Sequence, residues 1–146
     1  MKKTFYTWSQ FDKDVARLVR KIKRSKFVPG TIVGMARGGL PLAVVLSHRL
    51  HCPLLIVSAK TYADNKKQMD TVILNSSFTV PLRSPVLIVD EVADSGKTLQ
   101  VLMSHFESCG VDLKSLTLHY KPRSAVKPDF YADVKPNEEW LVYPWE

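Results

Sequence analysis

The sequence predicts an α/β fold in which a mainly parallel, twisted sheet is flanked by helices. Short apolar runs alternate with segments whose apolar residues recur at helical spacing, and this alternation is typical of parallel sheets covered by helices. Polar turns follow several of the apolar runs, and ligands of such sheets bind beyond the carboxyl ends of the strands. A chain of 146 residues, 45% of them hydrophobic, is expected to form one domain over residues 1–146.

Each expected element has its own signal. Ser9, with Asp12 three residues later, is typical of a helix start, and the apolar stripe that follows ends before Pro29 and Gly30 (Phe11, Val15, Leu18, Val19 and Ile22). Buried strands are expected at residues 31–35, 53–57, 86–90 and 115–120. Two further helices are expected, at 40–50 with Pro41 near its first position and at 97–108 closed by Gly110. The polar residues 60–70 predict an exposed loop.

The segment from Val86 to Thr98 carries the strongest functional signal. Its apolar run ends in the adjacent acids Asp90 and Glu91, and Asp94-Ser95-Gly96-Lys97-Thr98 then leads into a helix. A small-residue turn before a helix points backbone N–H groups and the positive end of the helix dipole at one spot, which suits a phosphate monoester. A nucleotide P-loop is excluded, because its first glycine would have to stand where Glu91 is. Acids beside a phosphate cradle favour a sugar phosphate.

This string resembles the phosphoribosyl-pyrophosphate (PRPP) binding motif of the type I phosphoribosyltransferases. The resemblance implies that Asp90 and Glu91 bind the ribose hydroxyls and that the turn binds the 5′-phosphate (Asp94, Ser95, Gly96, Lys97 and Thr98). It also places Asp94 near the base as the catalytic acid or base. The segment Ala36-Arg37-Gly38-Gly39 resembles the pyrophosphate loop of the family, so Arg37 and Gly38 are assigned to pyrophosphate. Residues 60–70 stand where the family has its flexible loop, and residues 66 and 67 are lysine candidates for pyrophosphate.

The C-terminal segment resembles that of the bacterial xanthine-guanine phosphoribosyltransferases. The resemblance implies that Lys121 donates to the purine 6-oxo group, that Trp140 stacks on the ring, that Leu141 offers backbone contacts and that Glu146 helps to hold a metal. A purine needs an aromatic platform, and a 6-oxopurine needs a cationic donor. A core over about 28–120 and a small hood formed by 121–146 with the N-terminal segment are implied too. Val142 and Lys97 depart from the pattern, which leaves guanine, xanthine and hypoxanthine open.

The sequence therefore predicts a purine phosphoribosyltransferase of purine salvage, which transfers 5-phosphoribosyl from PRPP to a 6-oxopurine. Mg²⁺ is the expected cofactor, held with the help of Asp90, Glu91 and Glu146. The expected partners are PRPP, the purine base and further copies of the chain in a dimer or tetramer. The alternative is a PRPP- or nucleotide-sensing regulator that uses the net charge of +7 to bind nucleic acid. The intact base platform argues against that alternative and against a nucleic-acid partner.

Other classes find little support in the sequence. No apolar run approaches the ~20 residues of a membrane span, and no secretory signal follows Met1, so a cytoplasmic protein is expected. Cys52 and Cys109 are far apart and are expected to be reduced and structural. His48 and His51 lack a Cys or acid partner that would complete a metal site.

Overall fold

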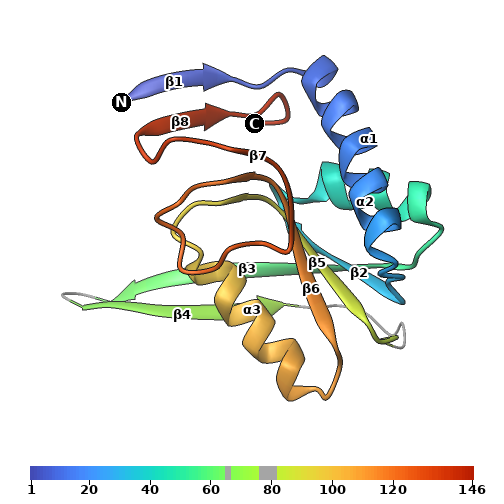
Figure 1. Cartoon of the computed structure of the whole chain (residues 1–146). Helices are drawn as coiled ribbons and strands as arrows, with labels where there is room; N and C mark the ends of the chain where they lie inside the picture. Colours follow the sequence, from blue (N-terminus) through green and yellow to red (C-terminus); the bar gives the residue numbers. More distant parts are fainter. Residues whose placement is uncertain (65–66, 76–81) are drawn as a thin grey trace.

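A computed structural model of the protein describes residues 1–64, 67–75 and 82–146, with side chains over 1–58 and 82–146. Its main sheet has six strands in the order β4-β3-β2-β5-β6-β7 (Figure 1). Five of these strands are mutually parallel, and only the edge strand β4 runs antiparallel to its neighbour β3. The strands are β2 (Thr31–Ala36), β3 (Leu54–Asp64), β4 (Lys67–Asn75), β5 (Val86–Ala93), β6 (Leu113–Tyr120) and β7 (Phe130–Val134). The predicted α/β class with a mainly parallel sheet is confirmed.

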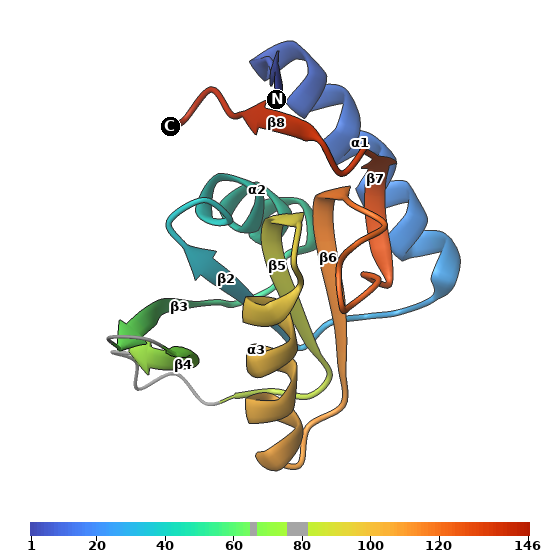
Figure 2. The same ribbon diagram turned by 90° about the vertical axis from the view of Figure 1, so that its left-hand side faces the viewer.

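Helices cover both faces of this sheet (Figure 2). The helices α1 (Trp8–Ser25) and α2 (Leu40–Leu50) pack on one face and α3 (Lys97–Ser108) packs on the other. Because side chains alternate along a strand, neighbouring residues serve opposite cores. Ile32 and Leu87 lie under α1 and α2, whereas Val33 and Ile88 lie under α3. The two cores hold the sheet between two layers of helix, and no helix within the described ranges is long and apolar enough to cross a membrane.

The first helix begins earlier than the sequence pattern predicts. Thr7 is its N-cap, and Thr7 with Gln10 forms a capping box: Thr7 Oγ1 accepts from Gln10 N (3.1 Å) and Gln10 Oε1 accepts from Thr7 N (2.8 Å). Ser9 therefore lies inside α1. Thr7 and Ser9 both stand shortly before the apolar stripe. Thr7 becomes the N-cap, because Gln10 three residues later completes its capping box. The predicted stripe is buried throughout.

Residues 60–70 were expected to form an exposed loop, and the structure corrects this. The strand β3 continues to Asp64, and β4 begins at Lys67, with Ser58 opposite Asn75 at one end of their pairing and Asp64 opposite Lys67 at the other. Residues 65 and 66 lie outside the described residues. Figure 1 shows both strands extending past the other strands of the sheet. Two antiparallel strands satisfy each other's backbone groups without the apolar runs that mark a buried strand, which is why the polar composition gave no strand signal.

The hood is a second, two-stranded sheet that brings the two ends of the chain together (Figure 1). In it β1 (Lys2–Phe5) pairs in parallel with β8 (Glu139–Val142), so that Lys3 lies opposite Trp140. The predicted boundary of the hood at residue 121 differs from the structure in one respect, because β7 pairs with β6 and belongs to the main sheet. The hood thus draws on β1, β8 and the residues after β8.

Aromatic side chains fasten the hood to the main sheet. The rings of Tyr6 and His119 meet edge to face with centroids 4.8 Å apart, and Tyr143 stacks on Trp145 at 5.1 Å. His119 Nδ1 lies 2.8 Å from Tyr143 Oη, which in turn donates to the carbonyl oxygen of Glu91 (3.3 Å). Burial, followed by the charge of a nearby lysine, lowers the pKa of His119 to about 4, so its ring is neutral near pH 7.

The capping box gives a first test. Thr7→Ala removes the side-chain acceptor at the start of α1 and should lower the free energy of unfolding by about 1 kcal/mol. The matched control is Ser9→Ala, because Ser9 is exposed within the first turn; it should change stability by less than about 0.5 kcal/mol. Urea denaturation measures both. A larger loss in Ser9→Ala than in Thr7→Ala would place the helix start where the sequence analysis had it.

Candidate active site

Parallel pairing delivers the candidate residues to one edge of the sheet. The strands β2, β5 and β6 are neighbours, and their carboxyl ends lead into Arg37, the 94–98 turn and Lys121. The pairing of β5 with β6 continues to Ala93 opposite Tyr120, and the Lys121 N–H then donates to the Ala93 carbonyl oxygen (3.0 Å). Residues 27 positions apart in sequence are thereby placed side by side: Lys121 Nζ donates to Asp94 Oδ2 (3.3 Å).

A small pocket of about 130 Å³ lies at the start of α3 and contains most of the predicted phosphate turn. Its lining comes from the end of β5 and the first residues of the helix (Asp90, Val92, Ala93, Asp94, Ser95, Gly96, Thr98 and Leu99). Gly96 is the N-cap of α3 with φ +78°, and the pocket lies at this helix N-terminus, where the first N–H groups have no partner within the helix. The exposed Lys97 is not part of the lining.

The phosphate turn is closely packed against the loop that follows Lys121. A Cβ on Gly96 would overlap the hydroxyl oxygen of Ser124 and would lie 2.8 Å from the backbone nitrogen of Ala125. The Ala125 N–H donates to the Ser95 carbonyl oxygen (2.8 Å). The absence of a side chain at Gly96 therefore permits both the left-handed backbone and the close approach of this loop.

A second pocket of about 130 Å³ contains the three residues predicted to bind the base, Lys121, Trp140 and Leu141. Lys121 is buried, whereas Trp140 is 54% exposed and so offers a ring face that the protein does not cover. The remaining lining residues come from the end of β5 and from the C-terminal segment (Glu91, Val92, Asp94, Tyr143 and Glu146). Asp94 lines this pocket and the phosphate pocket, so it stands where the two meet.

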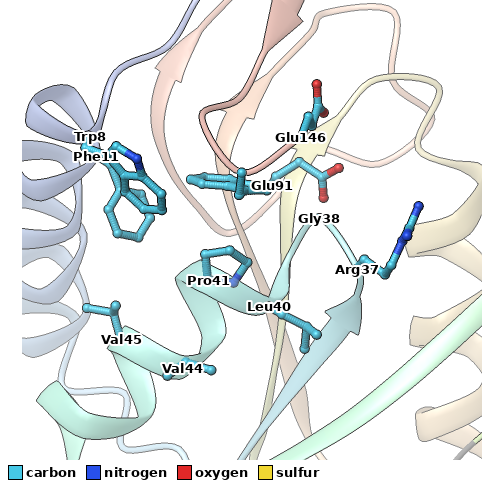
Figure 3. Close-up of a pocket in the computed structure, with 11 residues that line it drawn as sticks. Trp8, Phe11, Arg37, Gly38, Leu40, Pro41, Val44, Val45, Glu91 and Glu146 are labelled. Carbon is cyan, nitrogen blue, oxygen red and sulfur yellow. The ribbon is translucent and has the colours of Figure 1, made fainter.

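A larger pocket, of about 920 Å³, adjoins the second one (Figure 3). Arg37, Gly38, Glu91 and Glu146 gather at one side of it, and apolar side chains of α1 and α2 form the other side (Trp8, Phe11, Leu40, Pro41, Val44 and Val45). A Cβ on Gly38 would overlap the Glu91 carboxylate, so the Arg37 loop lies directly against that acid. The structure thus brings the predicted pyrophosphate loop next to one of the predicted ribose acids.

The adjacent acids Asp90 and Glu91 disfavour each other's negative charge. Burial, followed by hydrogen bonding to Glu91 and the charge of Glu91, raises the pKa of Asp90 well above its usual range. The Glu91 N–H donates to Asp90 Oδ1 (2.9 Å) and opposes part of that rise. Hydroxyl donors or a cation bound at this place would relieve the repulsion between the two carboxylates.

The three residues predicted to hold a metal are not gathered at one point. Glu91 and Glu146 line the same two pockets, whereas Asp90 lines the phosphate pocket. Within the described residues no three His, Cys, Asp or Glu side chains form a ready ligand set. Of the lysine candidates at 66 and 67, the first lies outside the described residues and the second has no described side chain.

Two residues of the site had not been predicted from the sequence. Arg123 Nε donates to Asp94 Oδ1 (2.6 Å), and Arg123 Nη2 also contacts that oxygen. Tyr143 lines the pocket of Lys121 and Trp140 and reaches the backbone of Glu91 through its hydroxyl. Arg123 follows Lys121 by two positions in a polar turn, which was the only sequence signal it offered.

The fold and the site together fit a protein that binds a phosphorylated sugar beside a flat, polar base. The phosphoribosyl transferase domain family matches residues 2–146, and the chain belongs to this family.

Known relatives match nearly the whole of this chain. The chain is 24% identical over 144 residues to a xanthine-guanine phosphoribosyltransferase of Idiomarina loihiensis, covering 97% of this chain and 86% of the relative. It is 26% identical over 145 residues to a second one from Cereibacter sphaeroides, covering 96% and 84%. The crystal structure of a purine phosphoribosyltransferase from Pyrococcus horikoshii superposes with a TM-score of 0.82 at 37% identity, covering 100% of this chain and 95% of that one.

The close packing at Gly96 can be tested against a second glycine with the same backbone. Gly110 has φ +76° but nothing within 4 Å of its Cβ position, so Gly110→Ala should cost only the left-handed strain of about 1 kcal/mol. Gly96→Ala adds the overlap with Ser124 and Ala125 and should lower the free energy of unfolding by more than this. Chemical denaturation measures both variants. Equal losses would show that the loop after Lys121 does not pack on the phosphate turn.

The raised pKa of Asp90 predicts a pH-dependent penalty. In the folded state the carboxyl keeps its proton to higher pH than in the unfolded state, so its contribution to stability falls as pH rises above about 4. Asp90→Asn removes this penalty and should raise the melting temperature at pH 8, with the gain shrinking toward pH 4.

Asp12→Asn, at an 80% exposed side chain, should show no such trend. Because His119 is present in every variant, its own titration cancels. A gain that is independent of pH would contradict the assignment.

Proposed function

We propose that this protein transfers the 5-phosphoribosyl group of PRPP to N9 of a 6-oxopurine. The observation that carries the proposal is the adjacency of Lys121 Nζ, a donor, and Asp94 Oδ2, an acceptor, 3.3 Å apart in the pocket of Trp140. The 6-oxo oxygen and a protonated N7 are neighbouring acceptor and donor groups on one edge of such a purine, so they complement this pair. The names of the relatives from I. loihiensis and C. sphaeroides support a 6-oxopurine as acceptor, and the name of the P. horikoshii protein supports a purine.

The other substrate parts follow from the order of the pockets. We assign the 5′-phosphate to the pocket at the start of α3 and the pyrophosphate to Arg37 and Gly38. The ribose then lies between them, where Asp90 and Glu91 accept from its hydroxyls. This order places the anomeric carbon within the negative field of the two acids.

In the reaction the bond from the anomeric carbon to the pyrophosphate oxygen breaks and the bond from that carbon to N9 forms. The carboxylates of Asp90 and Glu91 favour the positive charge that develops on the sugar. The base must lose one proton overall, and Asp94 accepts it from N7 while Lys121 stabilises the negative charge that builds up on the 6-oxo oxygen. The products are the nucleoside 5′-monophosphate and pyrophosphate.

Mg²⁺ fits this set of residues, although the described part of the chain offers no closed ligand cage. Mg²⁺ usually binds one or two carboxylates together with substrate phosphates and keeps several waters. Glu91 and Glu146, which line the same pockets, and the nearby Asp90 are the residues that would contribute. When bound, the ion would neutralise charge on the leaving pyrophosphate.

Assembly and location are also proposed. Large apolar side chains that line none of the three pockets stand exposed on β1, after α1 and on β7 (Phe5, Val28 and Val134), which supports the predicted homo-oligomer. Cys52 and Cys109 are both free, which supports the predicted cytoplasmic location. The alternative of a regulator that binds nucleic acid rests on net charge alone.

Measuring nucleotide formation tests the proposal directly. The protein is incubated with PRPP, Mg²⁺ and one base at a time from guanine, xanthine, hypoxanthine, adenine and orotate, and products are separated by chromatography. We expect a 6-oxopurine to be converted and adenine and orotate to be poor acceptors, and omission of Mg²⁺ with a chelator present should abolish turnover. Conversion of orotate or adenine alone would overturn the acceptor class.

The two base-binding assignments predict different defects. Trp140→Ala should weaken the binding of every purine by roughly 1–3 kcal/mol, as expected for lost base stacking. Lys121→Met should penalise guanine more than 2-aminopurine, which lacks the 6-oxo group, and should leave PRPP affinity nearly unchanged.

Calorimetric titration with each base measures both defects, and thermal melting reports the folded fraction. If Trp140→Ala lowers stability but not base affinity, Trp140 is a packing residue and the acceptor must be assigned anew.

A further inference from the structure

The carboxylate of Asp94 is held by two cations that differ in kind. Lys121 is buried and lines the base pocket, whereas the Arg123 side chain is 47% exposed and lines neither the base pocket nor the phosphate pocket. The two cations also take different oxygens: Lys121 contacts Oδ2, and both contacting nitrogens of Arg123 reach Oδ1. One edge of the carboxylate is therefore fixed from outside the pocket while the other edge faces Lys121.

Arg123 is itself held in place by the turn that carries it. Its backbone N–H donates to Asn137 Oδ1 (3.0 Å), and the Ser124 N–H closes the turn on the Lys121 carbonyl oxygen (2.9 Å). The next residue, Ala125, donates to the Ser95 carbonyl oxygen beside Asp94. The Lys121 N–H likewise donates to the carbonyl oxygen of Ala93, so the backbone that carries Arg123 is bonded to the residue before Asp94 and to the residue after it. The Arg123 side chain is therefore held at its base as well as at its guanidinium.

Without Arg123, little would fix the orientation of Asp94. The carboxylate is partly exposed, and its contact with Lys121 is long at 3.3 Å, whereas the contact with Arg123 Nε measures 2.6 Å. Charge-assisted hydrogen bonds of that length are the strong ones. A catalytic acid or base works only within hydrogen-bond reach of its proton, so a rotated carboxylate loses rate even where the substrates still bind.

We propose that Arg123 is a positioning residue of the reaction, which locks Oδ1 of Asp94 so that Oδ2 stays directed at N7 of the bound purine. This inference rests on the proposed function, in which Asp94 exchanges a proton with N7. Arg123 touches neither substrate and acts through Asp94 alone. The Lys121-Pro122-Arg123 turn then supplies both the donor to the 6-oxo group and the support of the neighbouring acid.

The test is a double-mutant cycle on the full chain with PRPP and the base that the wild type converts best. Arg123→Gln should lower kcat roughly tenfold, corresponding to the loss of a hydrogen bond between charged groups, with the KM for PRPP within about twofold of wild type. Asp94→Asn should lower kcat roughly 100-fold. Because Arg123 acts only through Asp94, the double variant should turn over no more slowly than Asp94→Asn.

Two further variants separate positioning from charge and from folding. Arg123→Lys keeps the charge but has only one nitrogen in place of the two that contact Asp94. It should therefore be faster than Arg123→Gln and slower than wild type. Arg49→Gln is the matched control, because Arg49 forms an ion pair with Asp12 and has a similarly exposed side chain at 48%; it should leave kcat unchanged. Melting temperatures of all variants are recorded beside the rates.

Each outcome decides the matter. Additive losses in the double variant, an unchanged rate in Arg123→Gln, or a rate loss that only follows a lowered melting temperature would each overturn the role of Arg123. If the wild type converts no purine, the proposed function fails and the role of Arg123 falls with it. An active wild type with additive losses leaves the function standing and removes only the positioning role.

Discussion

The parallel pairing of β5 with β6 is the constraint on which the site depends. Its register stays constant from Val86 opposite Leu113 to Ala93 opposite Tyr120, and the next N–H, that of Lys121, still bonds back to Ala93. Since parallel strands end at the same edge, the turn after β5 and the turn after β6 must meet, and Asp94 lies beside Lys121 for that reason alone. A slip of one residue in this register would send Lys121 to the opposite face of the sheet. The phosphate turn and the base pocket are therefore two consequences of one hydrogen-bond ladder.

The hood depends on a second interaction, the packing of aromatic rings around Tyr6. This residue joins β1 to α1, and its ring meets both His119 of β6 and Tyr143 near the C-terminus. Tyr143 in turn binds the backbone of Glu91, so the segment that carries Trp140 is linked to the acid pair. Such edge-to-face contacts contribute about 0.5–1.5 kcal/mol each beyond their buried area. The hood is held by several of them together with the four residue pairs of β1 and β8.

Function and stability pull in opposite directions at Asp90. Its carboxyl sits at the end of a fully buried apolar run and beside a second acid, which disfavours the charged form that the proposed ribose binding requires. Asp94 differs from Asp90, because the positive charges of Lys121 and Arg123 flank its carboxylate. One carboxylate of the motif is thus left uncompensated, ready for substrate hydroxyls, and the other is held in place by the protein. Natural sites often keep such destabilising groups where the ligand supplies the missing partner.

The sequence by itself determined those features that depend on residues close to one another along the chain. Pro41 marks the start of α2, where a fixed φ and a missing N–H are tolerated, and Gly110 follows α3, where its positive φ suits a residue without a side chain. The string from Val86 to Thr98 forms strand, turn and helix from neighbouring residues. The family resemblance likewise rested on contiguous strings. Only the tertiary structure decided the pairing of β1 with β8, the strands in residues 60–70 and the contact of Arg123 with Asp94, 29 positions away. These features are fixed by partners distant in sequence, and neither spacing nor composition records which distant backbone or side chain will complete a hydrogen bond.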